Sequence, residues 1–233
     1  MSRFVDLSHT LETGMPGSSM TGPDGRRFQA TAEIATVLDH EESAPLYDGK
    51  AAFAFTRASF HTSIGTYVDS PFVRFPAGRD VAALTLDELI LPGRRVAARG
   101  RAPGTPLGFA EMDLPSDLEG RAVLVDFGWD AHWGTATYGT PPFIARDAID
   151  ALIDAGVRLV GLDTPNADDR RDPERPAHTR LLAAGVLIVE NLRNLAALGA
   201  RPFRFYALPV KARGAASMPV RAFGEFLDGE AAT

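Results

Sequence analysis

The sequence contains no cysteine among its 233 residues, and Lys50 and Lys211 are its only lysines. The lack of cysteine excludes disulfide bonds and thiolate metal ligands. No apolar run is long enough to span a bilayer, and the N-terminus lacks the charged and then apolar segment of a secretory signal. The formal net charge of −6 argues against nucleic acids and membranes as partners. We therefore expect a soluble cytoplasmic protein.

Length and composition favour one domain over residues 1–233, because 45% hydrophobic residues suffice for a sizeable core. Apolar runs and turn residues predict strands and helices of an α/β protein, most clearly the helix and the strand at residues 145–163. We expect strands at residues 4–9, 28–38, 51–67, 95–98, 122–127, 159–163, 186–192, 203–210 and 214–222. We expect helices at residues 84–89, 145–155, 178–184 and 192–198, loops at 18–30, 39–45 and 166–177, and a flexible tail at 224–233.

Polar side chains gather around one glycine in residues 59–75, SFHTSIGTYVDSPFVRF. In an extended chain, alternate residues point to one face. The residues that share this face are His61, Ser63, Gly65, Tyr67 and Asp69. A polar face in an apolar segment is costly to bury without partners. The stretch is therefore either the wall of a site or a polar edge strand that ends at Pro71.

Two further regions carry candidate site residues. Trp129 and Trp133 follow the end of an apolar strand beside glycines, so they either wall an aromatic pocket or pack in the core. Glu190 ends another apolar strand, twelve residues after His178, and a carboxylate there must be paired, exposed or bound to a ligand. The residues alone leave a strand-end salt bridge and a ligand site both open.

The stretch at residues 59–75 resembles the signature of the cyclase family, which includes bacterial kynurenine formamidase. That signature reads His-x-Gly-Thr-His-x-Asp-x-Pro-x-His. Gly65-Thr66, Asp69 and Pro71 match it, whereas Ser63, Tyr67 and Val73 replace its three histidines. The family's second pattern, a histidine followed by an apolar strand that ends in Glu-Asn-Leu, matches His178 and Glu190. The resemblance covers roughly residues 4–223.

The resemblance implies an α/β fold with a mixed β-sheet core and flanking helices, called a swivelling β/β/α fold. It also implies hydrolysis of a small amide, lactam or lactone by an arylformamidase-like, metal-dependent enzyme. It assigns Asp69, His178 and Glu190 as ligands of a divalent ion, Mn²⁺ or Zn²⁺. It also implies a homodimer or homotetramer, with an N-terminal arm of about residues 1–30 in the contacts. Because two imidazole ligands are missing, the metal site is either reduced or absent.

The family's catalytic histidine is replaced by Val73, which cannot transfer protons. The candidates to take over this role are His61, His9, Tyr67 and Glu190, and we assign it to His61, Tyr67 or Glu190. We assign substrate binding to Ser63, Arg74, Trp129 and Trp133. The alternative interpretation is a non-catalytic relative that binds a small molecule or a partner protein.

Overall fold

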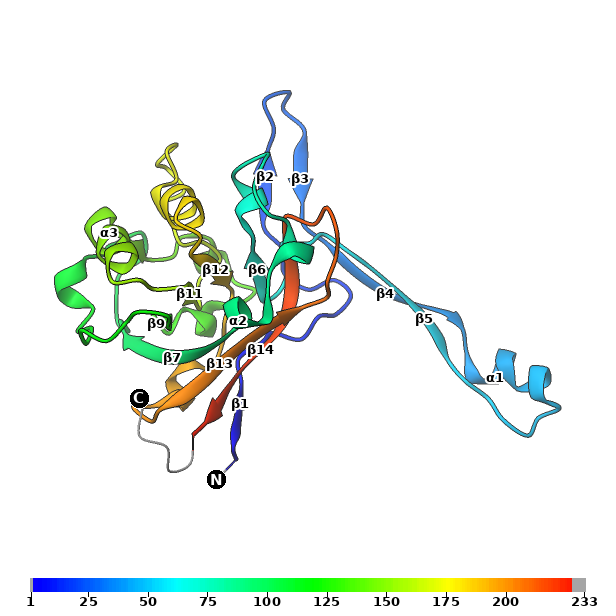
Figure 1. Ribbon diagram of the computed structural model, residues 1–233. Coiled ribbons are helices and arrows are strands. Elements are labelled where there is room, and N and C mark those ends of the chain that lie inside the picture. The colour runs from blue at the N-terminus through cyan, green and yellow to red at the C-terminus, as the bar shows by residue number, and fades with distance from the viewer. Residues whose placement is uncertain (1, 228–233) are drawn as a thin grey trace.

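The main sheet of the computed structural model has eight strands in the order β1-β14-β13-β7-β9-β11-β12-β6, and the structure describes residues 2–227. A further pairing of β14 with β6 closes seven of these strands into a barrel (Figure 1). The strands are β1 (Phe4–Asp6), β6 (Tyr67–Asp69), β7 (Ile90–Ala97), β9 (Ala122–Asp126), β11 (Leu159–Leu162), β12 (Leu187–Glu190), β13 (Phe203–Pro209) and β14 (Ser217–Phe226).

Parallel and antiparallel pairs both occur in the barrel. Strands β7, β9, β11 and β12 run parallel, whereas β6, β13 and β14 pair antiparallel. Every residue of β9, β11 and β12 is buried, as expected for parallel strands covered on both faces. The register of β6 on β12 sets Tyr67 opposite Glu190 and Asp69 opposite Ile188. This pairing brings the two sequence motifs to one place.

Helices are scarce in the described part of the chain. The α-helices are α1 (His40–Ser43), α2 (Leu86–Leu89) and α3 (Arg146–Asp154). The 3₁₀ turns are η1 (Ala44–Tyr47), η2 (Pro71–Val73), η3 (Val81–Ala83), η4 (Phe109–Glu111), η5 (Trp129–His132), η6 (Ala136–Gly139) and η8 (Leu195–Leu198). A π-helical segment, η7, spans Ala177–Leu181. Outside the main sheet, β8 (Pro106–Leu107) pairs with β10 (Phe143–Ile144). The predicted mixed sheet is thus confirmed, in a fold that consists mainly of strands. α3 is the main flanking helix. No helix in residues 2–227 is long and apolar enough to cross a membrane.

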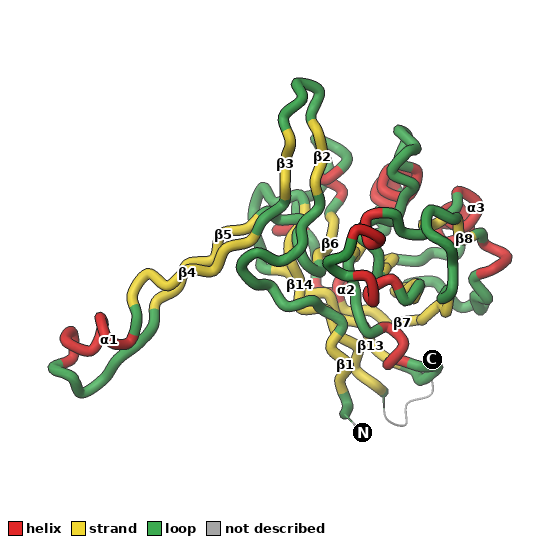
Figure 2. Tube along the Cα trace, turned by 180° about the vertical axis from the view of Figure 1, so that it is seen from behind, coloured by secondary structure: helices red, strands yellow, loops and turns green. Residues whose placement is uncertain are grey.

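Two hairpins leave the barrel. Strands β2 (Ser19–Thr21) and β3 (Arg27–Gln29) form the first, so the loop predicted at residues 18–30 is wrong. Strands β4 (Ala32–Leu38) and β5 (Phe55–Phe60) form the second, which extends far from the body as an arm with α1 near its end (Figures 1 and 2). The loop predicted at residues 39–45 contains α1, because Asp39 and Glu42 form a capping box.

The strand predicted at residues 51–67 is wrong as a continuous element. β5 ends at Phe60 and β6 begins at Tyr67, with turns between them. Gly65 has φ +62°, a left-handed conformation that an extended strand does not contain. Ile64 is buried against Met15 and Ala32 at this turn. The assumption that His61 shares one extended face with Asp69 therefore fails.

The C-terminal strand is longer than expected. β14 continues to Phe226, where the sequence predicts a flexible tail from residue 224. The Glu225 carboxylate accepts hydrogen bonds from Tyr206 and Arg3, which hold it against β13 and β1. The tail prediction is wrong for residues 224–226, and residues 228–233 lie outside the described part.

The barrel core gives a direct test of the fold. Leu124 lies in the middle of β9 with none of its surface exposed. We expect Leu124→Ala to lower the free energy of unfolding by about 2–5 kcal/mol, because it leaves a cavity. Urea denaturation measures this change. Val210→Ala is the control, since Val210 is 73% exposed, and it should cost less than about 0.5 kcal/mol. Equal effects of the two substitutions would contradict this core.

Candidate metal centre and adjoining cavity

Asp69 of β6, His178 of η7 and Glu190 of β12 meet inside the protein. One ligand atom from each lies within 4.8 Å of the others, and all three residues are buried. Nε2 of His178 lies 3.5 Å from Oδ2 of Asp69 and 3.4 Å from Oε1 of Glu190. The structure thus brings together the three residues that the sequence predicts as metal ligands.

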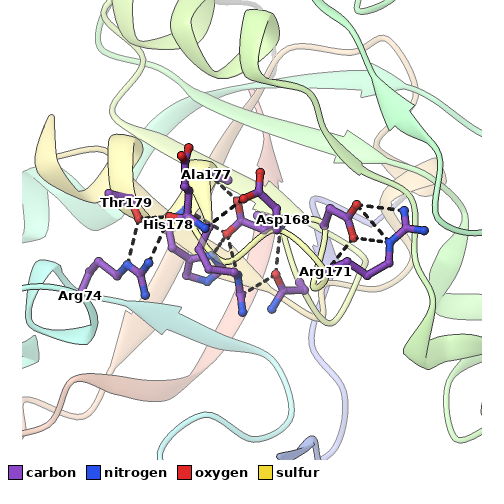
Figure 3. A network of polar contacts seen from close by, with 12 residues as sticks. Arg74, Asp168, Arg171, Ala177, His178 and Thr179 are labelled. Carbon is purple, nitrogen blue, oxygen red and sulfur yellow. Dashed lines mark hydrogen bonds and ion pairs between the residues drawn. The ribbon is translucent and has the colours of Figure 1, made fainter.

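Asp168 fixes the orientation of the His178 ring (Figure 3). Its Oδ2 lies 2.6 Å from Nδ1 of His178, and the same carboxylate accepts hydrogen bonds from the backbone of Ala177 and from Arg175. With Nδ1 held in this way, Nε2 faces Asp69 and Glu190. A carboxylate behind a histidine is the usual support of a metal ligand.

The two donor distances from His178 fit a metal ion. Two donors that each lie about 2.0–2.1 Å from one ion at a tetrahedral angle are about 3.3 Å apart. The two distances from Nε2, 3.4 and 3.5 Å, are close to that value. One nitrogen and two carboxylate oxygens are also a donor set that Zn²⁺ and Mn²⁺ accept.

The cluster binds a proton when no metal is present. Burial alone lowers the pKa of His178, but Glu190, Asp168 and Asp69 outweigh it and raise the pKa to about 10. Burial raises the pKa of Glu190, an effect that His178 partly offsets. Burial also raises the pKa of Asp168, but the contacts with His178 and its backbone lower it overall. His178 is therefore a cation among carboxylates in the metal-free protein.

Tyr67 connects this cluster to a cavity. Its hydroxyl donates a hydrogen bond of 2.5 Å to Oε2 of Glu190, while the backbone N–H of Ala167 donates to Oε1. Burial, Glu190 and Asp69 raise the pKa of Tyr67 well above its usual value, so the phenol keeps its proton. At this position the family signature has a histidine ligand, and here a neutral hydrogen-bond donor stands instead.

A cavity of about 450 Å³ lies beside Tyr67. Its walls include Met15, Ile64 and Trp133, with Ser63 also at the surface. Among the cluster residues and their hydrogen-bond partners, as far as the structure describes them, only Tyr67 lines it. A larger cavity, of about 550 Å³, adjoins β7 and β13 and contains none of the predicted site residues, so volume alone does not mark the site.

Polar groups brace the cavity wall. The Tyr138 hydroxyl donates to Oδ1 of Asn191, and Nδ2 of Asn191 donates to the backbone carbonyl of Gly65. All three residues line the cavity. Trp133 stacks on His9 with ring centroids 3.8 Å apart, and burial lowers the pKa of His9 to about 4. His9 is therefore a neutral support behind Trp133.

Three predicted site residues lie elsewhere. His61 is exposed, and its Nδ1 accepts a hydrogen bond from the backbone of Thr31 at the base of the arm. Arg74 donates to Thr179 and to the carbonyl of Glu174, outside the cavity lining (Figure 3). Trp129 is buried and donates to the carbonyl of Tyr138, so it supports the wall from behind.

Sequence reasoning missed several residues that shape the site. They are Asp168, Met15, Ile64, Tyr138, Asn191 and Arg170. Asp168 lies in a run of charged residues that reads as an exposed loop, yet it is 1% exposed. Its position ten residues before His178 was the only available signal. The others come from distant segments that only the fold brings together.

The model of the Putative cyclase family matches residues 5–169. The chain belongs to this family. It is 36% identical over 171 residues to a kynurenine formamidase of Salinibacter ruber, covering 71% of this chain and 76% of the relative. It is 28% identical over 224 residues to a kynurenine formamidase of Geobacillus thermodenitrificans, covering 95% of this chain and 97% of the relative. These matches confirm the resemblance inferred from the sequence.

Solved structures of the cyclase fold agree. An isatin hydrolase bound to the product analogue thioisatinate superposes with a TM-score of 0.79 at 22% identity, covering 95% of this chain and 91% of that one. A structure described as a potential metal-dependent hydrolase with cyclase activity gives 0.71 at 21% identity, covering 97% and 98%. At this level of identity the likeness concerns the fold.

The contact between Asp168 and His178 yields a first prediction for the site. We expect Asp168→Asn to weaken Mn²⁺ binding by about 10- to 100-fold, because the amide no longer holds the ring as a carboxylate does. Calorimetric titration measures the affinity. Asp169→Asn is the matched control, since within residues 2–227 the Asp169 side chain pairs only with Arg171. Equal affinities of the two variants would contradict the supporting role of Asp168.

The raised pKa of His178 yields a second prediction. A proton on Nε2 competes with a metal at every pH below about 10, and a rise in pH removes that competitor. The apparent affinity for Mn²⁺ should therefore rise about tenfold per pH unit above about pH 8, and more steeply below about pH 7, where Glu190, whose pKa is raised to about 7, also gives up a proton. Titrations in buffers of different ionisation enthalpy should show about one proton released per ion at pH 8 and about two at pH 6. An affinity independent of pH would refute this competition.

Proposed function

We propose that this chain is a metal-dependent hydrolase of a small amide, lactam or lactone. The observation that carries the proposal is the buried donor set of Asp69, His178 and Glu190, with distances of 3.4 and 3.5 Å that fit one ion. The adjoining cavity of about 450 Å³ has the size of a small-molecule site. The kynurenine formamidase and isatin hydrolase relatives support the same class of reaction.

Each residue of the cluster has a distinct part. Asp69, His178 and Glu190 would hold the ion, and Asp168 keeps Nε2 of His178 turned toward it. A divalent ion bound here lowers the pKa of water and polarises a carbonyl group. Nε2 of His178 lies 3.4 Å from Oε1 of Glu190, so Oε1 is the oxygen that faces the other donors, while Oε2 accepts the Tyr67 hydrogen bond.

Tyr67, the hydrogen-bond partner of Glu190, is the residue next to the cluster that can contact a substrate in the cavity. Its neutral phenol is placed to donate a hydrogen bond to a substrate oxygen or nitrogen when it turns from Glu190. Trp133 and Tyr138 present ring surfaces that would hold a flat substrate and exclude water. His61 has no role in this function, because its ring lies outside the cavity lining and accepts a hydrogen bond from the backbone of Thr31.

One observation favours a second function, the binding of a small molecule without turnover. Val73, which stands where the family has its catalytic histidine, is 38% exposed in η2. Within the described lining of the cavity, no histidine or carboxylate replaces it. A protein that cannot move a proton to the leaving nitrogen would bind amides and hydrolyse them slowly.

Elemental analysis separates these two functions. Protein purified without chelator should carry about one divalent ion per chain and hydrolyse one of a panel of formamides, lactams and lactones. Glu190→Gln should lose most of the ion and about 100-fold or more in rate, because an amide oxygen is a weak ligand. Glu119→Gln, at an exposed position, is the control. If the ion is absent even after soaking in Mn²⁺ and Zn²⁺, the hydrolase proposal fails.

We also propose that the protein is a homodimer or homotetramer. The arm formed by β4 and β5 supports this, because an isolated two-stranded hairpin is only marginally stable in water. Large apolar side chains are exposed along the arm, including Leu46, Tyr47 and Phe55 at 50–67%. A second copy of the chain would bury this surface.

Shortening the arm tests the assembly. Replacement of residues 36–56 by a short glycine-containing turn should leave the barrel folded, because the arm strands pair with each other outside the main sheet. We expect the variant to become a monomer in multi-angle light scattering, whereas the intact chain is an oligomer. If the shortened variant has as many chains per particle as the intact protein, the arm is excluded as the main contact. A monomeric intact chain would refute the proposal.

A further inference from the structure

Arg170 is the one charged side chain among the described residues that line the cavity beside Tyr67. We propose that Arg170 selects substrates in which the aromatic ring bears a carboxylate. This inference rests on the proposed hydrolase function and names the substrate class of the same site. It is carried by the position of Arg170 and the character of the cavity walls.

Arg170 contributes an exposed side chain to the cavity lining, whereas Tyr67 on the same lining is only 7% exposed. Nη2 of Arg170 donates to the carbonyl of Ser19 in β2, at 3.2 Å, which ties the loop at residues 166–177 to the first hairpin. No other hydrogen bond of Arg170 occurs within residues 2–227, so its remaining N–H groups are free for a ligand.

The neighbouring arginine differs in this respect. Arg171 donates to both oxygens of Asp169 at 2.9–3.2 Å, and it does not line this cavity. Its charge is already compensated by that carboxylate. The two adjacent residues therefore provide a matched pair, one guanidinium available to a substrate and one occupied.

The walls between Arg170 and Tyr67 suit a flat ring. Trp133 contributes an aromatic face, and Met15 and Ile64 contribute apolar surface. Two side-chain amides line the cavity: Asn191 uses its oxygen on Tyr138 and its nitrogen on Gly65, and Gln29 donates to the carbonyl of Gly17. The interior therefore has no cation for a carboxylate, and such a group is best satisfied at Arg170. A planar guanidinium is well matched to a carboxylate in geometry and charge.

This arrangement fixes the direction of the substrate. With a carboxylate at Arg170, the ring lies along Trp133 and the amide points to Tyr67, behind which the metal donors lie. A neutral amide of the same size has no such anchor and can bind in other orientations. The charge should therefore act mainly on KM and, through orientation, to a smaller extent on kcat.

The test compares formanilide with the three isomers of formamidobenzoate, which differ from it only by a carboxylate. For the intact metal-loaded enzyme, we expect at least one isomer to exceed formanilide in kcat/KM by about 10- to 100-fold. Arg170→Gln should reduce this ratio to within about threefold, chiefly by raising KM for the isomer. Arg170→Lys should keep part of the ratio, because it retains the charge. Arg171→Gln should keep all of it.

Calorimetric binding of the aminobenzoates and aniline provides a readout without turnover. Tighter binding of an aminobenzoate than of aniline, lost in Arg170→Gln and kept in Arg171→Gln, supports the carboxylate site even if no amide is hydrolysed. In that case the hydrolase function fails and the site stands. The inference is overturned if the kcat/KM ratio and the binding preference survive in Arg170→Gln. It is also overturned if Arg171→Gln reduces them as much as Arg170→Gln does.

Discussion

Three carboxylates buried beside one imidazole form the constraint on which this structure depends. Asp69, Asp168 and Glu190 are each 1–3% exposed, and an uncompensated charge costs several kcal/mol in such a place. Arg175 pairs with Asp168, which leaves two negative charges beside His178. One proton on His178 compensates only one of them, whereas a divalent ion compensates both. Burial and the nearby Asp69 charge raise the pKa of Glu190, so a second proton would neutralise the remaining negative charge. The cluster is thus built for a charge of plus two.

Barrel closure holds this charge arrangement in place. β6 has only three residues, yet it pairs with β12 on one edge and β14 on the other. The Thr66 hydroxyl, just before β6, donates to the carbonyl of Asn191, just after β12. The two strands that carry Asp69 and Glu190 are therefore fixed along their whole length. Loss of either pairing would separate the carboxylates and expose the cluster to water, so the closed barrel and the site depend on each other.

The metal donors could be predicted because each lies in a short sequence pattern. The resemblance to the cyclase family then assigns all three the role of metal ligand. Asp168 could not be distinguished from Asp169 in a charged run, since burial of one and exposure of the other arise only from the fold. His61 was misplaced because alternation was extended through Gly65, whose left-handed backbone turns the chain. The strands at residues 122–127 and 159–163 were clear, because buried parallel strands are continuously apolar. The arm was not, because its apolar residues are exposed in this chain.

Tyr67 in place of a histidine changes two properties of the site at once. The substitution removes an imidazole donor, and the Tyr67 hydrogen bond to Oε2, together with that of the Ala167 N–H to Oε1, competes with an ion for the Glu190 carboxylate. Both effects weaken metal binding relative to a site with more nitrogen ligands, and they favour ions that accept oxygen donors. The same phenol places a neutral donor in the buried part of the cavity lining, while Arg170 contributes an exposed cation to it. A substrate that spans the two would gain orientation from the protein itself, which offsets part of what the weaker metal site gives up.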